Sequence, residues 1–211
     1  VKTLQLSPGI SSAGKGSSGF FVRGGGIDQN LILLDEAVVF NASHLLGFFS
    51  VFNSDAIKDV ALYKGGIPAQ YGGRGSSVMD ITMRDGNNKK FGAKGGIGLI
   101  SSRLTVEAPI VKDKGSFLIA GRRSYADLFL KFSADENLRN TALFFYDLNL
   151  KANYTINQKN RVYLSGYFGR DKFGNDAFGF DWGNATGTIR WNHLFSDKLF
   201  SNTTFIVSNY D

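Results

Sequence analysis

The feature that most constrains the fold is a strict alternation of side chains from Phe144 to Ile156. One set of alternate positions is apolar: Phe144, Tyr146, Leu148, Leu150, Ala152, Tyr154 and Ile156. The other set is largely polar: Phe145, Asp147, Asn149, Lys151, Asn153 and Thr155. Because side chains of a β-strand point to opposite faces in turn, the run predicts one long strand with an apolar and a polar face. It exceeds the roughly 5 to 6 residues common in soluble sheets and passes the about 9 to 11 that a tilted strand needs to cross a bilayer, which favours a membrane barrel.

The connections between strands support the same class of fold. Shorter alternating runs follow at 161–168 and 186–192, and an ambiguous run extends from Leu199 to Tyr210. Breaks rich in Gly, Asn, Asp and charged residues are expected at 111–115, 124–143, 157–160, 171–183 and 196–198. Short and long breaks therefore alternate, as the periplasmic turns and extracellular loops of transmembrane barrels do.

Two further elements complete this part of the chain. A hairpin is expected within 91–110, reversing near 98–102, which brings the count to roughly seven strands. Closed single-chain barrels have an even number of strands, so the chain is expected to end inside an incomplete barrel. Apolar residues at helical spacing between Tyr125 and Leu138 predict a short helix in the first long loop.

The residues up to Gly86 differ from the rest in composition. They hold seven basic and seven acidic residues, so the whole net charge of +6 falls after them. They also hold 14 of the 26 glycines. A polar stretch at 84–90 is the expected boundary between units at 1–86 and 87–211. Within the first unit, 20–26 and 30–35 predict a hairpin with a wide glycine turn, and 59–66 and 77–83 predict two more strands.

Five motifs in this first unit occur in a specific order. They are VRGGG (22–26), LILLDE (31–36), IKDVALYKGG (57–66), AQYGGRGSSV (69–78) and DITMRDG (80–86). In this order they resemble the plug domain of TonB-dependent outer-membrane receptors, and the phrase SHLLGFFSVFN (43–53) resembles receptors of the Bacteroidetes type. Two departures affect the expected contacts between plug and barrel: family plugs often read Leu-Asp-Gly where this chain has Asp35-Glu36, and often have Glu at the position of Ala61.

The resemblance implies a fold and a function. The fold is an α+β plug domain over 1–86, followed over 87–211 by the first antiparallel strands of a transmembrane β-barrel, which in this family has about 22 strands. The function is import of a scarce ligand, such as a siderophore, glycan or peptide, across the outer membrane of a Gram-negative bacterium. The implied partners are TonB with its inner-membrane energising complex, outer-membrane lipid and an unknown small ligand.

Three alternatives remain open at this stage. The first is a glycan importer that pairs with a surface lipoprotein. It ranks below the interpretation above, because this chain has QYGGRG (70–75) where that branch has a different motif. A signalling receptor that reports ligand occupancy inward is the second alternative. The third is a soluble β-rich binding module, which would bury its strand faces against another sheet.

Candidate site residues follow from the motifs and from the polar strand faces. The expected plug-motif residues are Arg23, Gly24, Gly25, Asp35, Tyr63, Lys64, Gly65, Tyr71 and Gly72. Arg23 is a candidate to pair with Glu107 of the barrel, and the paired glycines at 24–25, 65–66 and 72–73 are expected in turns that need positive φ. The expected lumen-facing or ligand-facing residues are Asp147, Asn149, Lys151, Asn153, Arg190 and Asn192, with Trp182 in the second long loop.

Other function classes find little support. His44 and His193 lie far apart in sequence and are interpreted as structural or interfacial rather than as metal ligands. The sequence has no nucleophile elbow, no Ser-His-Asp constellation and no cysteine, so neither an enzyme nor a cofactor or metal site is predicted. Its basic residues are scattered singly, which speaks against nucleic-acid binding.

Overall fold

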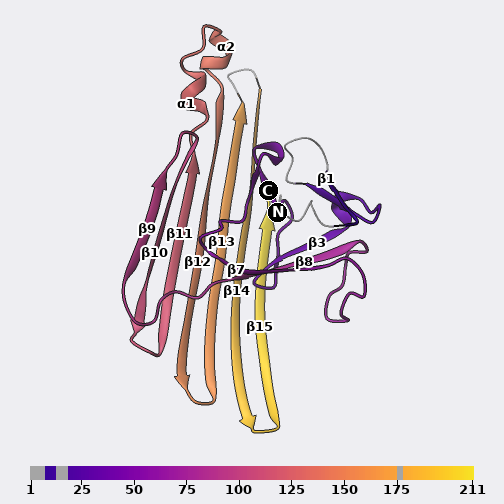
Figure 1. Cartoon of the computed structure of the whole chain (residues 1–211), viewed down its shortest axis with the longest axis vertical. Coiled ribbons are helices and arrows are strands. Elements are labelled where there is room, and N and C mark those ends of the chain that lie inside the picture. The colour runs from indigo at the N-terminus through magenta and orange to yellow at the C-terminus, as the bar shows by residue number, and fades with distance from the viewer. Residues whose placement is uncertain (1–7, 13–18, 175–177) are drawn as a thin grey trace.

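The computed structural model of the chain describes residues 8–12, 19–174 and 178–211. Its largest element is a tall antiparallel sheet of seven strands, each paired with its neighbours in chain order (Figure 1). The strands are β9 (Gly92–Ile97), β10 (Ser101–Val111), β11 (Gly115–Ser124), β12 (Ala142–Asn157), β13 (Asn160–Gly174), β14 (Gly179–Ser196) and β15 (Leu199–Tyr210). The hairpin expected within 91–110 is formed by β9 and β10.

The turns at one end of the sheet are short, and the opposite end carries the first long loop. Residues 112–114, 158–159 and 197–198 form the short turns. The long loop contains two short helices, α1 (Asp127–Leu130) and α2 (Glu136–Arg139), where the sequence predicts one (Figure 1). No helix in the described residues is long and apolar enough to cross a membrane.

The predicted second long loop at 171–183 is wrong. Strands β13 and β14 continue through it and stay paired as far as Gly174 and Gly179, while 175–177 lie outside the described residues. The polar residues that resembled a loop are strand residues with partners, since Asp171 contacts His44 and Asp181 contacts Arg170. Trp182 consequently lies on β14, not in a loop.

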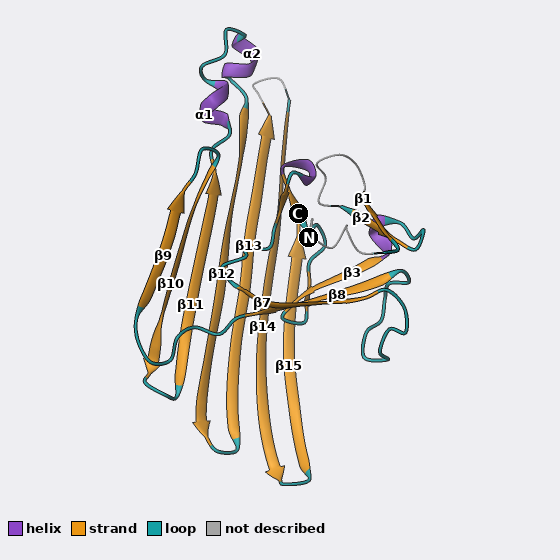
Figure 2. Ribbon diagram, in the orientation of Figure 1, coloured by secondary structure: helices purple, strands orange, loops and turns teal. Residues whose placement is uncertain are grey.

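A smaller N-terminal unit packs on one face of the large sheet (Figure 2). Its central sheet has the order β4–β3–β8–β7, formed by β3 (Asn30–Leu34), β4 (Ala37–Val38), β7 (Ile57–Tyr63) and β8 (Ser77–Met83), with β3 parallel to β8. Two small hairpins flank it: β1 (Ile10–Ser12) with β2 (Phe20–Val22), and β5 (Ser43–His44) with β6 (Phe49–Ser50). The 3-10 helices η2 (Ile27–Gln29) and η3 (Leu45–Gly47) complete the unit.

The predicted hairpin between 20–26 and 30–35 is also wrong. Strand β2 pairs with β1, and β3 pairs with β4 and β8. The residues between β2 and β3 include η2, whose helical turn separates the two strands instead of folding one back on the other.

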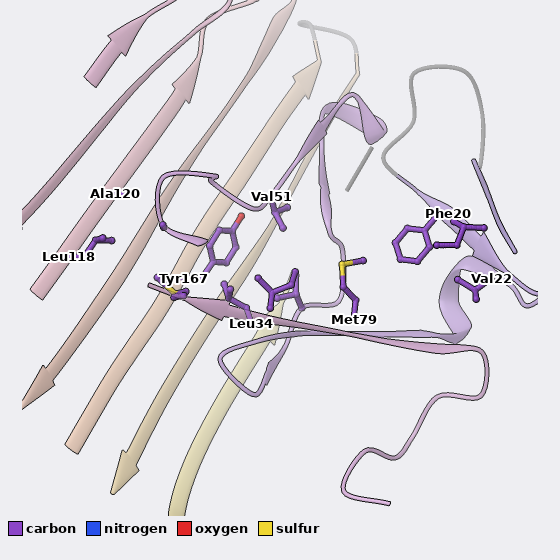
Figure 3. Close-up of a cluster of buried hydrophobic side chains, with 13 residues drawn as sticks. Phe20, Val22, Leu34, Val51, Met79, Leu118, Ala120 and Tyr167 are labelled. Atoms are coloured by element: carbon purple, nitrogen blue, oxygen red, sulfur yellow. The ribbon is translucent and has the colours of Figure 1, made fainter. Parts of the chain in front are cut away.

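The hydrophobic core joins the two units (Figure 3). Phe20, Leu34 and Met79 of the N-terminal unit belong to one buried cluster with Leu118 and Tyr167 of the large sheet. We call the sheet face that packs on this unit the inner face, and the opposite one the outer face. The inner face is mostly polar and buried, whereas the outer face exposes apolar side chains: Tyr146, Leu148, Leu150, Leu164, Phe168, Ile189 and Trp191.

Candidate functional site between the N-terminal unit and the large sheet

The first contact between the two units is made by His44 at the end of β5. Its side chain is buried, with Nδ1 2.6 Å from Asp171 Oδ2 on β13 and Nε2 3.4 Å from Asp147 Oδ2 on β12. The backbone N–H of Leu45 donates to the other oxygen of Asp171 at 2.7 Å. The imidazole also stacks on Phe145, with ring centroids 4.2 Å apart. His44 therefore joins two strands of the sheet to the N-terminal unit.

Arg122 on β11 completes this buried cluster. Its Nε donates to Asp147 Oδ2 at 2.8 Å, and its Nη2 donates to the backbone oxygen of Ser50 at 2.7 Å. Burial opposes protonation of His44, but its hydrogen bonds to Asp147 and Asp171 outweigh burial and raise its pKa. With His44 protonated, two cations and two carboxylates balance in charge, as buried ions require.

The second contact is the two-residue turn between β3 and β4. Its residues Asp35 and Glu36 have φ of 47° and 74°, the signature of a type I′ turn. Lys151 Nζ lies 2.5 Å from Asp35 Oδ2, and Arg190 Nη2 lies 2.5 Å from Glu36 Oε1. Thr188 donates from its hydroxyl to the backbone oxygen of Asp35 at 3.0 Å. Here Glu36 occupies a left-handed position that favours glycine, and its carboxylate reaches the sheet.

The third contact lies where the chain leaves β8. Arg84 Nη1 lies 2.8 Å from Glu107 Oε2 on β10, and the backbone N–H of Asn87 donates to the same oxygen at 3.0 Å. The predicted pair between Arg23 and Glu107 is therefore wrong. Arg84 directly follows a strand that ends against the large sheet, whereas Arg23 follows β2 and lies against Gly65.

Most of the plug-motif residues gather away from the large sheet. Arg23, Gly24, Gly25, Lys64 and Gly65 line one hollow together with Ser76. Lys64 Nζ donates to the backbone oxygen of Pro8 at 2.9 Å. Asp35, also in the predicted plug-motif set, instead forms an ion pair with Lys151 of the sheet.

Two tyrosines of the motif set share another part of the unit. The rings of Tyr63 and Tyr71 are 5.4 Å apart, and the Tyr71 hydroxyl donates to Asp80 at 2.7 Å. Burial and this hydrogen bond to Asp80 raise the pKa of Tyr71 to about 12.

The glycine prediction is right for half of its positions. Gly24, Gly66 and Gly73 have φ of 81°, 59° and 85°. Gly25, Gly65 and Gly72 do not have positive φ. At Gly25 the reason for glycine is close approach, because a Cβ there would collide with the Ser76 hydroxyl.

The polar positions of β12 lie on the inner face. Asp147, Asn149, Lys151 and Asn153 are all buried beneath the N-terminal unit. Asn153 donates to the Ser116 hydroxyl at 3.0 Å. Within the described residues, the Asn149 side-chain amide has no protein partner at either end. A polar layer thus lines the sheet behind the unit.

The predicted residues of β14 share this inner face. Arg190 and Asn192 stand opposite Tyr163 and Arg161 of β13, and Trp182 stands opposite Asp171. The inner face therefore carries the predicted inward residues together with Arg122, which sequence reasoning missed, and it contacts His44, which the sequence analysis interpreted as structural or interfacial. The available signal was Asp147 at a polar strand position, because a buried carboxylate there requires a cation. In the described part of the chain, no group of three or more His, Asp or Glu side chains is arranged to hold a metal ion.

Comparisons with known proteins agree with this architecture. Residues 2–78 match the family model of the TonB-dependent Receptor Plug Domain. A mutant of the ferric enterobactin receptor PfeA from Pseudomonas aeruginosa is 14% identical, with a TM-score of 0.67 over 98% of this chain and 37% of its own. The siderophore receptor PirA from Acinetobacter baumannii is 15% identical, with a TM-score of 0.67 over 96% of this chain and 36% of its own.

A third similar structure is the copper transporter OprC, which is 14% identical and has a TM-score of 0.65 over 97% of this chain and 33% of its own. No curated protein matches the sequence. The chain spans about a third of the length of these solved proteins. Its N-terminal unit and large sheet thus have the fold of a TonB-dependent receptor plug and adjoining barrel strands.

Proposed function

We propose that the chain is the plug domain, over 1–86, and the first seven barrel strands, over 87–211, of a TonB-dependent receptor in the outer membrane of a Gram-negative bacterium. The match of residues 2–78 to the plug family supports this function. The observation that carries it is the sidedness of the sheet. Apolar residues such as Leu148, Leu164 and Trp191 are exposed on the outer face, while buried polar residues face the plug. A barrel wall between lipid and a polar lumen requires this arrangement.

The proposed activity is uptake of a scarce ligand, such as a siderophore, a glycan or a peptide. The ligand docks on the extracellular side, and TonB, powered from the inner membrane, pulls the plug to open a path. In this mechanism the ion pairs of His44, Asp35, Glu36 and Arg84 hold the plug in its seat until force is applied. The complete barrel of about 22 strands would supply the remaining wall.

The bacterial group from which the receptor comes and the subfamily to which it belongs are part of the same proposal. The phrase at 43–53 supports a receptor of the Bacteroidetes type. A glycan importer that pairs with a surface lipoprotein is the second branch. It predicts that the lipoprotein co-purifies with the full-length receptor in mild detergent, whereas a receptor for small ligands purifies without it.

The experiment that tests the function uses the full-length gene product in a Gram-negative host. The membranes are fractionated, and the outer-membrane fraction is analysed for a heat-modifiable, detergent-extracted, β-rich species. Growth on candidate ligands is then compared in hosts with and without TonB. Recovery in the outer membrane and TonB-dependent growth are the expected results. A product found in the soluble fraction would overturn the proposal and favour the β-rich binding module.

The binding module meets a physical difficulty in this structure. Ile189 and Leu164 are each 50% exposed on the outer face, within a broad band of other apolar side chains. A soluble protein rarely leaves so large an apolar patch in contact with water. Lipid contact removes this cost, which supports the receptor.

A further inference from the structure

Three cations surround one aromatic ring on the inner face of the large sheet. The Arg161 guanidinium lies 4.8 Å from the centre of the Tyr163 ring, and Lys151 Nζ and the Arg190 guanidinium each lie 5.8 Å from it. They come from the adjacent strands β12, β13 and β14, where Tyr163 stands opposite Asn153 and Arg190. We call Lys151, Arg161 and Arg190 the basic cluster.

Each member of the basic cluster has a carboxylate partner on the N-terminal unit. Lys151 pairs with Asp35 at 2.5 Å, Arg190 with Glu36 at 2.5 Å, and Arg161 with Asp85 at 3.8 Å. The three carboxylates, together with Lys151, Arg190 and Tyr163, line a cavity of about 310 Å³ between the unit and the sheet. The cations of the basic cluster therefore belong to the wall, and their carboxylate partners belong to the unit, which also contributes Lys58 and Asp80 to the cavity lining.

Movement of the unit away from the wall would separate these charges. Asp35 and Glu36 lie in the β3–β4 turn and leave with the unit. Asp85 lies just after β8, in the segment that connects the unit to the sheet, and separates from Arg161 only if this segment also shifts. Cations left without partners on the wall of a water-filled lumen attract anions, because the low-dielectric wall focuses their field into the lumen. Their side chains are also held in place, since each rests against the same tyrosine ring.

We propose that the basic cluster is a binding site for an anionic solute bearing carboxylate or phosphate groups, closed at rest by Asp35, Glu36 and Asp85 and opened when the plug moves. The plug carboxylates occupy the positions that the anionic groups of the solute take during passage. This inference rests on the proposed function and extends it by naming the chemical class of the cargo. It assigns the unit a second role, in which it shields the site as well as closing the barrel.

The test uses the full-length receptor in planar lipid bilayers. Urea is raised until the N-terminal unit releases, which is detected as the onset of conductance. The chloride-to-potassium permeability ratio is then measured from the reversal potential in a KCl gradient. The parental receptor is compared with the triple variant Lys151→Gln, Arg161→Gln, Arg190→Gln. The matched control, Arg123→Gln, Arg170→Gln, Lys172→Gln, removes three cations whose register places them on the outer face.

The expected result is a fall of about twofold or more in the permeability ratio for the basic-cluster variant, with no change for the control. Citrate and pyrophosphate then serve as separate probes for block of the open current. Block by either probe should weaken at least about tenfold in the basic-cluster variant, and the more potent probe tells whether the site prefers carboxylate or phosphate.

Conductance with an unchanged permeability ratio in the basic-cluster variant, or block by neither probe, would overturn this inference and leave the proposed function standing. A fall of the same size in the outer-face control would also overturn it, because the effect would then not belong to the inner wall. A parental receptor that never conducts, and that is absent from the outer membrane, would overturn the proposed function and this inference with it. Heat-modifiability of all three proteins establishes that the barrels are folded.

Discussion

His44 Nδ1 lies 2.6 Å from Asp171 Oδ2, so a side chain of the N-terminal unit is bonded to a strand of the large sheet 127 residues further along the chain. The pair is almost completely buried, and Asp147 and Arg122 adjoin it. Because buried charges are tolerated only as partners, this contact specifies how the unit sits against the sheet. Substitution or deprotonation of His44 should therefore weaken the binding of the N-terminal unit to the sheet.

Replacing His44 with Ala should loosen the unit. The substitution leaves Asp147 and Asp171 buried with Arg122 as the remaining cation of the cluster, and removal of one partner from a buried ion pair costs about 3 to 5 kcal/mol. The measurement is the urea concentration at which the unit releases in the full-length receptor, seen as the onset of conductance. His193→Ala is the matched control, because His193 bonds Asn160 within the sheet and shares the outer face with Trp191. Equal midpoints for the two variants would contradict the prediction.

The seating of the unit should weaken as the pH rises. The pKa of seated His44 is raised, because hydrogen bonds to Asp147 and Asp171 outweigh burial. Its stabilising contribution is therefore complete below the ordinary histidine pKa of about 6.5 and is lost as the pH rises through the raised value. The Tyr167 hydroxyl lies 3.2 Å from His44 Nε2, and tyrosines ionise only well above this pH range.

The same release experiment, repeated across this pH range, checks the prediction. The parental urea midpoint should fall with rising pH, and His44→Gln should remove the dependence on His44 ionisation. A parental midpoint that rose with pH, or a slope that survived in His44→Gln, would refute the assignment to His44.

Two substitutions at Glu36 should separate backbone strain from charge. Glu36 has φ of 74° and pairs with Arg190, whose side chain is 29% exposed. Glu36→Gln removes the charge and keeps the strain, whereas Glu36→Gly removes both. Relief of the left-handed conformation is worth about 1 kcal/mol, and a partly exposed ion pair contributes at most a similar amount. The glycine variant should therefore be about 1 kcal/mol more stable than the glutamine variant in urea release, and the reverse order would show that side-chain contact outweighs strain.

The sequence predicts the large sheet better than the N-terminal unit. The alternation from Phe144 to Ile156 defines a strand and its two faces, because period 2 is a local property. The extension of β13 and β14 through 171–183 was not predictable in this way. Asp171 and Asp181 resemble loop residues until their partners His44 and Arg170 are known, and His44 is distant in sequence.

The candidate site depends on the same kind of distant contact. The sequence places Lys151 and Arg190 on polar strand positions, but it does not indicate that Asp35 and Glu36 meet them. That contact needs a type I′ turn built without glycine, which sequence preferences argue against. The sequence also predicts the wrong partner for Glu107, Arg23 in place of Arg84, for a similar reason. The end of β8, which precedes Arg84, is positioned by the pairing of β8 with β3 and β7.

Gly25→Ala should destabilise the N-terminal unit although Gly25 has no positive φ. A Cβ at Gly25 would collide with the side chain of Ser76, whose hydroxyl donates to the backbone oxygen of Val22 at 2.8 Å. Relief of the collision must displace Ser76 and this hydrogen bond, and overpacking of this kind costs about 1 to 3 kcal/mol.

Gly72→Ala provides the matched control for this substitution. Gly72 also lacks positive φ, and nothing lies within 4 Å of the position that its Cβ would take. The urea release midpoint should therefore fall for Gly25→Ala and stay near the parental value for Gly72→Ala. Adding Ser76→Gly to Gly25→Ala should recover part of the loss, because it removes both side-chain atoms of Ser76, Oγ and Cβ, that the new Cβ would meet. A double variant no more stable than Gly25→Ala would mean that the collision with Ser76 is not the cause.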